Sequence, residues 1–122
     1  MVDVYLCDDV PELRRLLRII LEEDPGLRVV GESGDAQIGI EEIAELQPNV
    51  VLLDLSMPGM DGLEALPLIR RVAPETSVIV FSGFMESRMA SLVLEQGADR
   101  YIEKGQPLER VREAVRELTI SR

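Results

Sequence analysis

The chain has 122 residues, of which 46% are hydrophobic and 30% charged, as is usual for one globular domain. A formal net charge of −10 argues against binding of DNA or RNA by this segment, since phosphate contacts need clustered lysines and arginines. The absence of histidine excludes Ser-His-Asp and Cys-His nucleophilic systems and leaves zinc without its usual ligands. No apolar run approaches the roughly 20 residues of a membrane span, and no signal-peptide pattern occurs, so we expect a cytoplasmic domain without membrane contact.

Hydrophobic patterning predicts five strands that alternate with five helices. Strands are expected at 2–7, 27–31, 50–54, 77–82 and 99–103. The expected helices run from Pro11 to Asp24, through 38–46, 63–72 and 86–96, and onward from Pro107.

The residues within these elements allow further predictions. The first helix should carry leucines on one face and three arginines on the other, Arg14, Arg15 and Arg18. The second helix should carry the apolar residues Ile38, Ile40, Ile43, Ala44 and Leu46. Gly39 should weaken that helix by about 1 kcal/mol relative to alanine, and Pro67 removes a backbone donor from the third helix. Cys7 is the only cysteine, so no internal disulfide can form, and its apolar strand predicts a core residue.

The alternation of strands and helices has the rhythm of successive βαβ units. Right-handed crossovers then produce a parallel sheet with helices on both faces. We therefore predict an α/β fold, a flavodoxin-like doubly wound sheet of five parallel strands in the order 2-1-3-4-5 with five helices. Residues 1–122 are expected to form a single domain, because the chain is too short for two ordinary cores.

Polar residues follow four of the predicted strands. They are Asp8 and Asp9, Asp54, Ser82 and Lys104. Taken singly, each is more typical of a helix cap or a solvated turn than of a binding site. Taken together, they suit one chemistry, because open α/β sheets bind ligands at the carboxyl ends of their strands.

The chemistry that fits this set is phosphoryl transfer to a carboxylate. Three neighbouring carboxylates need a cation, and oxygen ligands without histidine or cysteine favour Mg²⁺. A carboxylate such as Asp54 can accept a phosphoryl group and become an aspartyl phosphate. The Lys104 ammonium would neutralise one phosphoryl oxygen, and the Ser82 hydroxyl would hydrogen-bond another.

These residues resemble the receiver domain of bacterial two-component response regulators over essentially the whole chain. The matching segments are Asp8-Asp9, the run from Asp54 to Gly62, Phe81-Ser82-Gly83, and Tyr101-Ile-Glu-Lys104. Many receivers have proline directly after the lysine, whereas here Gly105-Gln106 come before Pro107. This arrangement, with the sequence Tyr-Ile-Glu-Lys-Gly, resembles that of the subgroup whose receivers precede a LuxR-type helix-turn-helix.

The resemblance implies a phosphoacceptor and a metal site. Asp54 would receive phosphate from a histidine of a sensor kinase, which is the implied partner. Asp9, Asp54 and the main-chain carbonyl of Ser56 would hold Mg²⁺ directly, and Asp8 would act mainly through water. Ser56 and Phe84 fall where the family tunes the lifetime of its phosphate.

The resemblance also implies a switch. Ser82 would be the switch hydroxyl and Tyr101 the aromatic that turns inward on activation. For Tyr101 an alternative stays open, that of a partly buried strand residue whose hydroxyl meets water. The altered surface would be made by the fourth helix, fifth strand and fifth helix, and a homodimer could form there or through the first and fifth helices.

Three functions stay open. The first is a phosphorylation switch with no enzymatic activity beyond its own phosphorylation and dephosphorylation. The second is an aspartate-nucleophile phosphatase of the haloacid-dehalogenase type, which usually has a second aspartate where this chain has Ser56. The third is an adaptor that works without phosphorylation. For the output, we expect control of transcription through a DNA-binding domain beyond residue 122, with a stand-alone receiver as the alternative.

Overall fold

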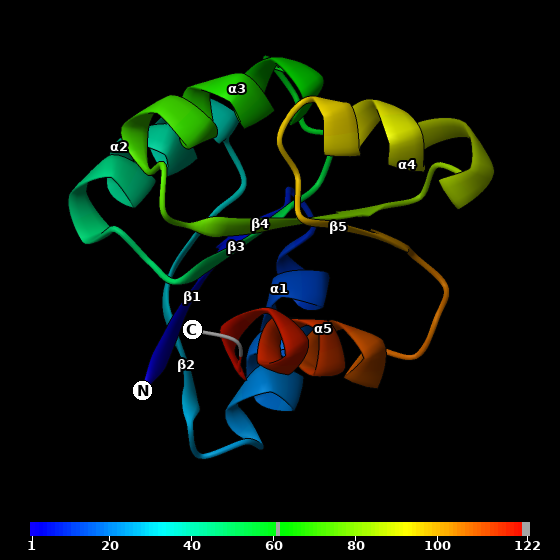
Figure 1. The fold of residues 1–122 in the computed structure, drawn as a ribbon. Coiled ribbons are helices and arrows are strands. Elements are labelled where there is room, and N and C mark those ends of the chain that lie inside the picture. The colour runs from blue at the N-terminus through cyan, green and yellow to red at the C-terminus, as the bar shows by residue number, and fades with distance from the viewer. Residues whose placement is uncertain (61, 121–122) are drawn as a thin grey trace.

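The computed structural model describes residues 1–60 and 62–120, so Asp61 of the segment 54–62 lies outside the described residues. Within these residues five strands alternate with five helices (Figure 1). They are β1 (Val2–Cys7), α1 (Pro11–Glu22), β2 (Leu27–Ser33), α2 (Ala36–Leu46), β3 (Val50–Leu53), α3 (Gly62–Val72), β4 (Ser77–Ser82), α4 (Glu86–Glu95), β5 (Arg100–Glu103) and α5 (Glu109–Ile120). The strands form one parallel sheet in the order β2-β1-β3-β4-β5, which confirms the predicted fold and strand order.

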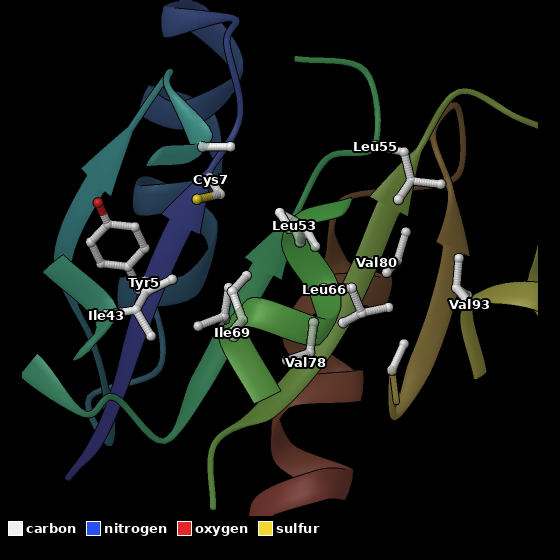
Figure 2. Close-up of a cluster of buried hydrophobic side chains, with 14 of the residues drawn as sticks. Tyr5, Cys7, Ile43, Leu53, Leu55, Leu66, Ile69, Val78, Val80 and Val93 are labelled. Atoms are coloured by element: carbon white, nitrogen blue, oxygen red, sulfur yellow. The ribbon is translucent and has the colours of Figure 1, made fainter. Parts of the chain in front are cut away.

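The sheet lies between two layers of helices. In Figure 1, α2, α3 and α4 cover one face, and α1 and α5 cover the other. Alternate strand residues therefore enter two separate cores: Tyr5 and Leu53 face α2 and α3, whereas Leu6 and Leu52 face α1 and α5. Figure 2 shows the first of these cores, to which Tyr5, Cys7, Ile43 and Leu53 contribute. Because both faces are covered, the central strands β3 and β4 are buried at every position.

Of the five apolar residues expected on α2, all are helical, but three do not face the sheet. Ile38 and Leu46 are 51% and 45% exposed, and Ala44 is also exposed. The buried side of the helix consists instead of Ala36, Gly39 and Ile43, together with the partly buried Ile40. The helix begins where the Asp35 side chain accepts the N–H of Ile38 at 3.0 Å, and from there the 3.6-residue period turns Ile38 away from the sheet.

Gly39 lies where α2 packs against β1. A Cβ at this position would lie 2.6 Å from the Sγ of Cys7, so only glycine fits against the strand. Gly39 therefore contributes close packing in exchange for its lower helix propensity. Cys7 is 1% exposed, which confirms its prediction as a core residue.

Some helix ends also differ from the prediction. The last helix begins at Glu109 rather than at Pro107, because Lys104 and Gln106 form an isolated bridge and Leu108 still lies in a turn. Pro67 lies inside α3, as predicted, with its ring exposed. No helix of the described residues has the length and apolar character needed to cross a bilayer.

Candidate functional site

Asp8 and Asp54 directly follow two neighbouring strands at the centre of the sheet. The backbone hydrogen bonds of the sheet continue one residue beyond each strand: Asp54 N–H donates to the Cys7 carbonyl at 2.9 Å, and Asp8 N–H donates to the Ser33 carbonyl at 3.0 Å. The neighbouring backbone thus fixes both residues, and each is only 3% exposed.

Lys104 lies between these two carboxylates. Its Nζ is 2.9 Å from Asp8 Oδ2 and 3.3 Å from Asp54 Oδ2, and it is also 5.7 Å from the centre of the Phe81 ring. Its main-chain N–H donates to the Ser82 carbonyl at 2.7 Å, which extends the pairing of β4 and β5. Gly105 follows with φ of +104°, in the left-handed region that favours glycine, so the chain turns sharply behind the lysine.

Asp8, Asp9 and Asp54 could hold a metal ion together. Each offers a carboxylate oxygen, and these oxygens lie within 4.8 Å of one another. Asp8 and Asp54 are buried, whereas Asp9 is exposed. A set of hard oxygen ligands with no nitrogen or sulfur donor suits Mg²⁺, which retains several waters. These residues therefore fit the predicted ion.

Ser56 lies beside the same group. It is exposed, and its main-chain N–H donates to Asp54 Oδ1 at 3.1 Å. That bond holds the loop after β3 against the Asp54 carboxylate. The role of the Ser56 carbonyl as a metal ligand stays a prediction.

Burial and charge act in opposite directions on the two central groups. Burial raises the pKa of Asp54, against the lowering by the Ser56 N–H and the Lys104 charge. Burial alone would lower the pKa of Lys104, but the hydrogen bond to Asp8 and the charges of Asp54 and Asp8 outweigh it and raise that pKa. The lysine therefore stays charged. Burial removes water from the charged Asp54 carboxylate, which is unfavourable, and a bound cation would offset that penalty.

Ser82, Phe84 and Tyr101 form a chain of contacts beside this group. Ser82 is fully buried, and its Oγ accepts the main-chain N–H of Phe84 at 3.4 Å. The hydroxyl of Tyr101 donates to the Phe84 carbonyl. Tyr101 is only 9% exposed, so its ring already lies inward and its hydroxyl has a protein partner rather than water alone. Both sides of the Phe84 main chain are thus tied to a residue of the predicted switch.

One contact was missing from the sequence prediction. Arg14 was expected on the outer face of α1, yet its side chain is only 16% exposed, and its Nη1 donates to the Asp8 carbonyl at 2.5 Å. The only indication of this contact in the sequence is that Arg14 follows Asp8 by six residues, on the helix that comes next. Of the residues predicted at this edge, Asp8, Asp9, Asp54 and Lys104 lie together, and Ser82 is joined to Lys104 through its main-chain carbonyl.

A family model described as the response regulator receiver domain matches residues 4–116. The chain belongs to this family. The match includes β1 from residue 4 onward, the other four strands and most of α5, so the carboxylate edge lies within it.

Relatives of this receiver domain include transcriptional regulators. The chain is 36% identical over 116 residues to the transcriptional regulatory protein LiaR of Bacillus subtilis, which covers 95% of this chain and 55% of LiaR. A two-component response regulator of the LuxR family from Aurantimonas sp. has a similar structure, with a TM-score of 0.93 and 30% identity over 100% of this chain and 87% of that one. The predicted likeness to LuxR-type regulators is confirmed.

Similar receiver sequences also occur in proteins that are not named as transcriptional regulators. A protein-glutamate methylesterase/protein-glutamine glutaminase of Myxococcus xanthus is 39% identical over 106 residues, which is 87% of this chain but 30% of that protein. The chain spans about half the length of the curated regulators it matches, such as LiaR, and a smaller part of this methylesterase.

Proposed function

We propose that this receiver domain accepts a phosphoryl group on Asp54 from a phosphohistidine of a sensor kinase, with Mg²⁺, and that the phosphorylated form changes its surface to control an output. The observation that carries the proposal is the buried Asp54 carboxylate, 3.3 Å from the Lys104 ammonium and within 4.8 Å of the oxygens of Asp8 and Asp9. A carboxylate desolvated in this way and surrounded by countercharge is suited to phosphoryl transfer, which depends on positioning and charge neutralisation.

In the proposed reaction an oxygen of Asp54 attacks the phosphorus of the donor. The new oxygen–phosphorus bond forms while the phosphorus–nitrogen bond breaks, and the electron pair of that bond returns to the imidazole of the kinase. Asp8, Asp9, Asp54 and the Ser56 carbonyl would hold Mg²⁺, which when bound neutralises charge on the phosphoryl oxygens. Lys104 would neutralise a further oxygen, and the contact of its Nζ with Asp54 Oδ2 supports this role.

The response to phosphorylation is proposed to pass through Phe84. An aspartyl phosphate carries about −1.5 to −2 charges in place of the single charge of the carboxylate, and it brings new acceptors to this edge, which the Ser82 hydroxyl can hydrogen-bond. If Ser82 turns toward the phosphoryl group, the N–H of Phe84 loses the bond to its Oγ. The Phe84 carbonyl, which accepts the Tyr101 hydroxyl, would then carry that change to β5 and the start of α4.

Acetyl phosphate with Mg²⁺ tests the central step, read by intact-protein mass spectrometry. Wild-type protein should gain about 80 Da, as expected for one phosphoryl group on a carboxylate. Asp54→Asn should gain nothing, and Asp35→Asn, which changes an exposed carboxylate at a helix cap, should label as the wild type does. Equal labelling of Asp54→Asn would refute the assignment. Hydrolysis of the donor without any adduct would favour the phosphatase reading.

For the output, we propose control of transcription through a domain that follows the receiver. LiaR, which shares the receiver over about half its length, is a transcriptional regulatory protein, and this supports the proposal. The methylesterase of Myxococcus xanthus favours an enzymatic output as the second candidate. Sequencing the gene beyond codon 122 separates the two, since a helix-turn-helix and an esterase domain differ in length and motifs. Sedimentation with and without phosphorylation then tests for the proposed homodimer.

A further inference from the structure

Arg14 of α1 makes two different contacts at the carboxylate edge. Its Nε donates to Oε1 of Glu32 on β2 at 2.8 Å, and its Nη1 donates to the main-chain carbonyl of Asp8 at 2.5 Å. The guanidinium is planar, so fixing it on Glu32 also fixes the direction from which Nη1 reaches Asp8. Gly34 leaves room for this contact, because a Cβ there would lie 3.1 Å from Arg14 Nη1.

Asp8 is held at every polar group. Its N–H donates to the Ser33 carbonyl, its Oδ1 accepts the N–H of Val10 at 2.9 Å, and its Oδ2 contacts Lys104 at 2.9 Å. The remaining group is the carbonyl, which Arg14 binds. That carbonyl belongs to the peptide unit that joins Asp8 to Asp9, so its direction sets the direction of the Asp9 backbone.

Asp9 has no such support of its own. It is exposed, and among the described residues no hydrogen bond or ion pair of its side chain is found. Its carboxylate nevertheless lies within 4.8 Å of those of Asp8 and Asp54. The position of this third carboxylate therefore depends on the peptide unit before it.

We infer that Arg14 is a positioning residue for the metal site, which orients Asp9 by holding the Asp8 carbonyl while Glu32 holds the guanidinium. The inference rests on the proposed function, since it assumes that Asp8, Asp9 and Asp54 bind Mg²⁺. Arg14 does not touch the ion in this role. Partners of this kind, which orient metal ligands, commonly change metal affinity about 10-fold or more when they are removed.

Arg18 provides a matched control. It lies one turn further along α1, donates from Nη2 to Oε2 of the same Glu32 at 2.8 Å, and bonds the Val29 carbonyl rather than that of Asp8. Arg14→Gln and Arg18→Gln therefore each remove one positive charge and one bond to Glu32. Only Arg14→Gln releases the Asp8–Asp9 peptide unit.

The charge effect and the positioning effect have opposite signs. Removing a positive charge beside three carboxylates should by Coulomb attraction strengthen the binding of a cation. Loss of positioning should weaken it. The direction of the change in Mg²⁺ affinity therefore separates the two explanations.

The test is titration calorimetry of the whole chain with MgCl₂, with thermal unfolding measured on the same samples. We expect Arg14→Gln to raise the Mg²⁺ dissociation constant about 10-fold and Arg18→Gln to change it less than about 2-fold, although both lower Tm to a similar extent. Arg14→Lys keeps the charge but cannot span Glu32 and the Asp8 carbonyl as the guanidinium does, so it should also weaken binding, and it serves if Arg14→Gln fails to fold.

Unchanged or tighter Mg²⁺ binding by the Arg14 variants would overturn the inference while leaving the proposed function intact. A wild-type chain that bound no Mg²⁺ would overturn both. Equal weakening by Arg14→Gln and Arg18→Gln would also overturn it, because it would assign the effect to the shared contact with Glu32.

Discussion

Replacing Lys104 by methionine should destabilise the protein strongly at neutral pH. The change keeps a similar unbranched stem but removes an ammonium 2.9 Å from Asp8 and 3.3 Å from Asp54. The side chains of those aspartates are only 5% and 3% exposed, so two buried carboxylates would be left facing each other. Removal of one partner from a fully buried ion pair costs about 3–5 kcal/mol. Lys104 is 25% exposed, so water screens part of the loss, and we expect about 2–3 kcal/mol.

The loss should shrink as the pH falls. Burial raises the pKa of Asp54, so the folded protein binds this proton more tightly than the unfolded chain does. A group of this kind supports folding most below its unfolded pKa, and that support is lost as the pH rises through the folded pKa. Without Lys104 the pKa of Asp54 should rise further, so protonation relieves the variant more than the wild type. The difference in stability should therefore be largest near neutrality and smaller at about pH 5.

Urea unfolding followed by circular dichroism, first in EDTA and then in excess MgCl₂, measures these effects. Mg²⁺ should recover part of the lost stability, because an ion that binds only the folded state stabilises it by mass action. Arg28→Met is the control: it breaks the Arg28–Asp3 pair, whose side chains are 57% and 30% exposed, and should cost less than about 1 kcal/mol. Equal losses in the two variants, or a larger Lys104→Met loss at acidic pH, would refute the reasoning.

Three further predictions concern α2 and the strand beneath it. Gly39→Ala should destabilise by about 1–2 kcal/mol in urea unfolding despite better helix propensity, since its Cβ would lie 2.6 Å from Cys7 Sγ; adding Cys7→Ala should recover most of that loss, and a stabilised Gly39→Ala would contradict this. Burial raises the pKa of the Cys7 thiol to about 12, so iodoacetamide at mildly alkaline pH should label the urea-unfolded chain and spare the folded one. Asp35→Ala should cost about 1 kcal/mol by removing the cap on the Ile38 N–H, and Asp35→Asn much less, as thermal unfolding would show.

The strand order and the carboxylate edge could be predicted because they follow from the order of apolar runs. A run such as 50–53 has no polar position, so it must be covered on both faces, and that restricts the fold to a parallel sheet with helices on each side. Once the strands are parallel, the residues that follow them meet at one edge. Asp8, Asp54 and Lys104 are brought together by topology, without any need to know side-chain contacts.

The errors lie where a side chain's environment depends on the approach of two elements. Ile38 and Leu46 are as apolar as Ile43, and the packing of Gly39 against Cys7, with the start of α2 at Asp35, turns Ile43 and not these two toward the sheet. Arg14 belongs to an arginine-rich stretch that is typical of a solvated helix face. Its contact with the Asp8 carbonyl depends on the position of Glu32, which lies on β2. Neither environment has a local pattern in the sequence.

The two ends of α4 are held by contacts at opposite edges of the sheet. At the edge opposite Asp54, Arg70 of α3 donates to the carbonyls of Thr76 and Gly97 and contacts Asp99, so it ties the end of α3 to the start of β4 and the end of α4. Asp99 in turn accepts the Val78 N–H at 2.8 Å.

The start of α4 is held differently. It follows Phe84, which is 49% exposed and is tied by main-chain bonds to Ser82 and Tyr101. Those two bonds connect Phe84 to Ser82, at the carboxyl end of β4, and to Tyr101 of β5, whereas the contacts of Arg70 lie at the opposite edge. If phosphorylation moves Ser82 as proposed, we expect the change to act on the first turn of α4 while Arg70 holds the segment after its last turn, so that the helix tilts.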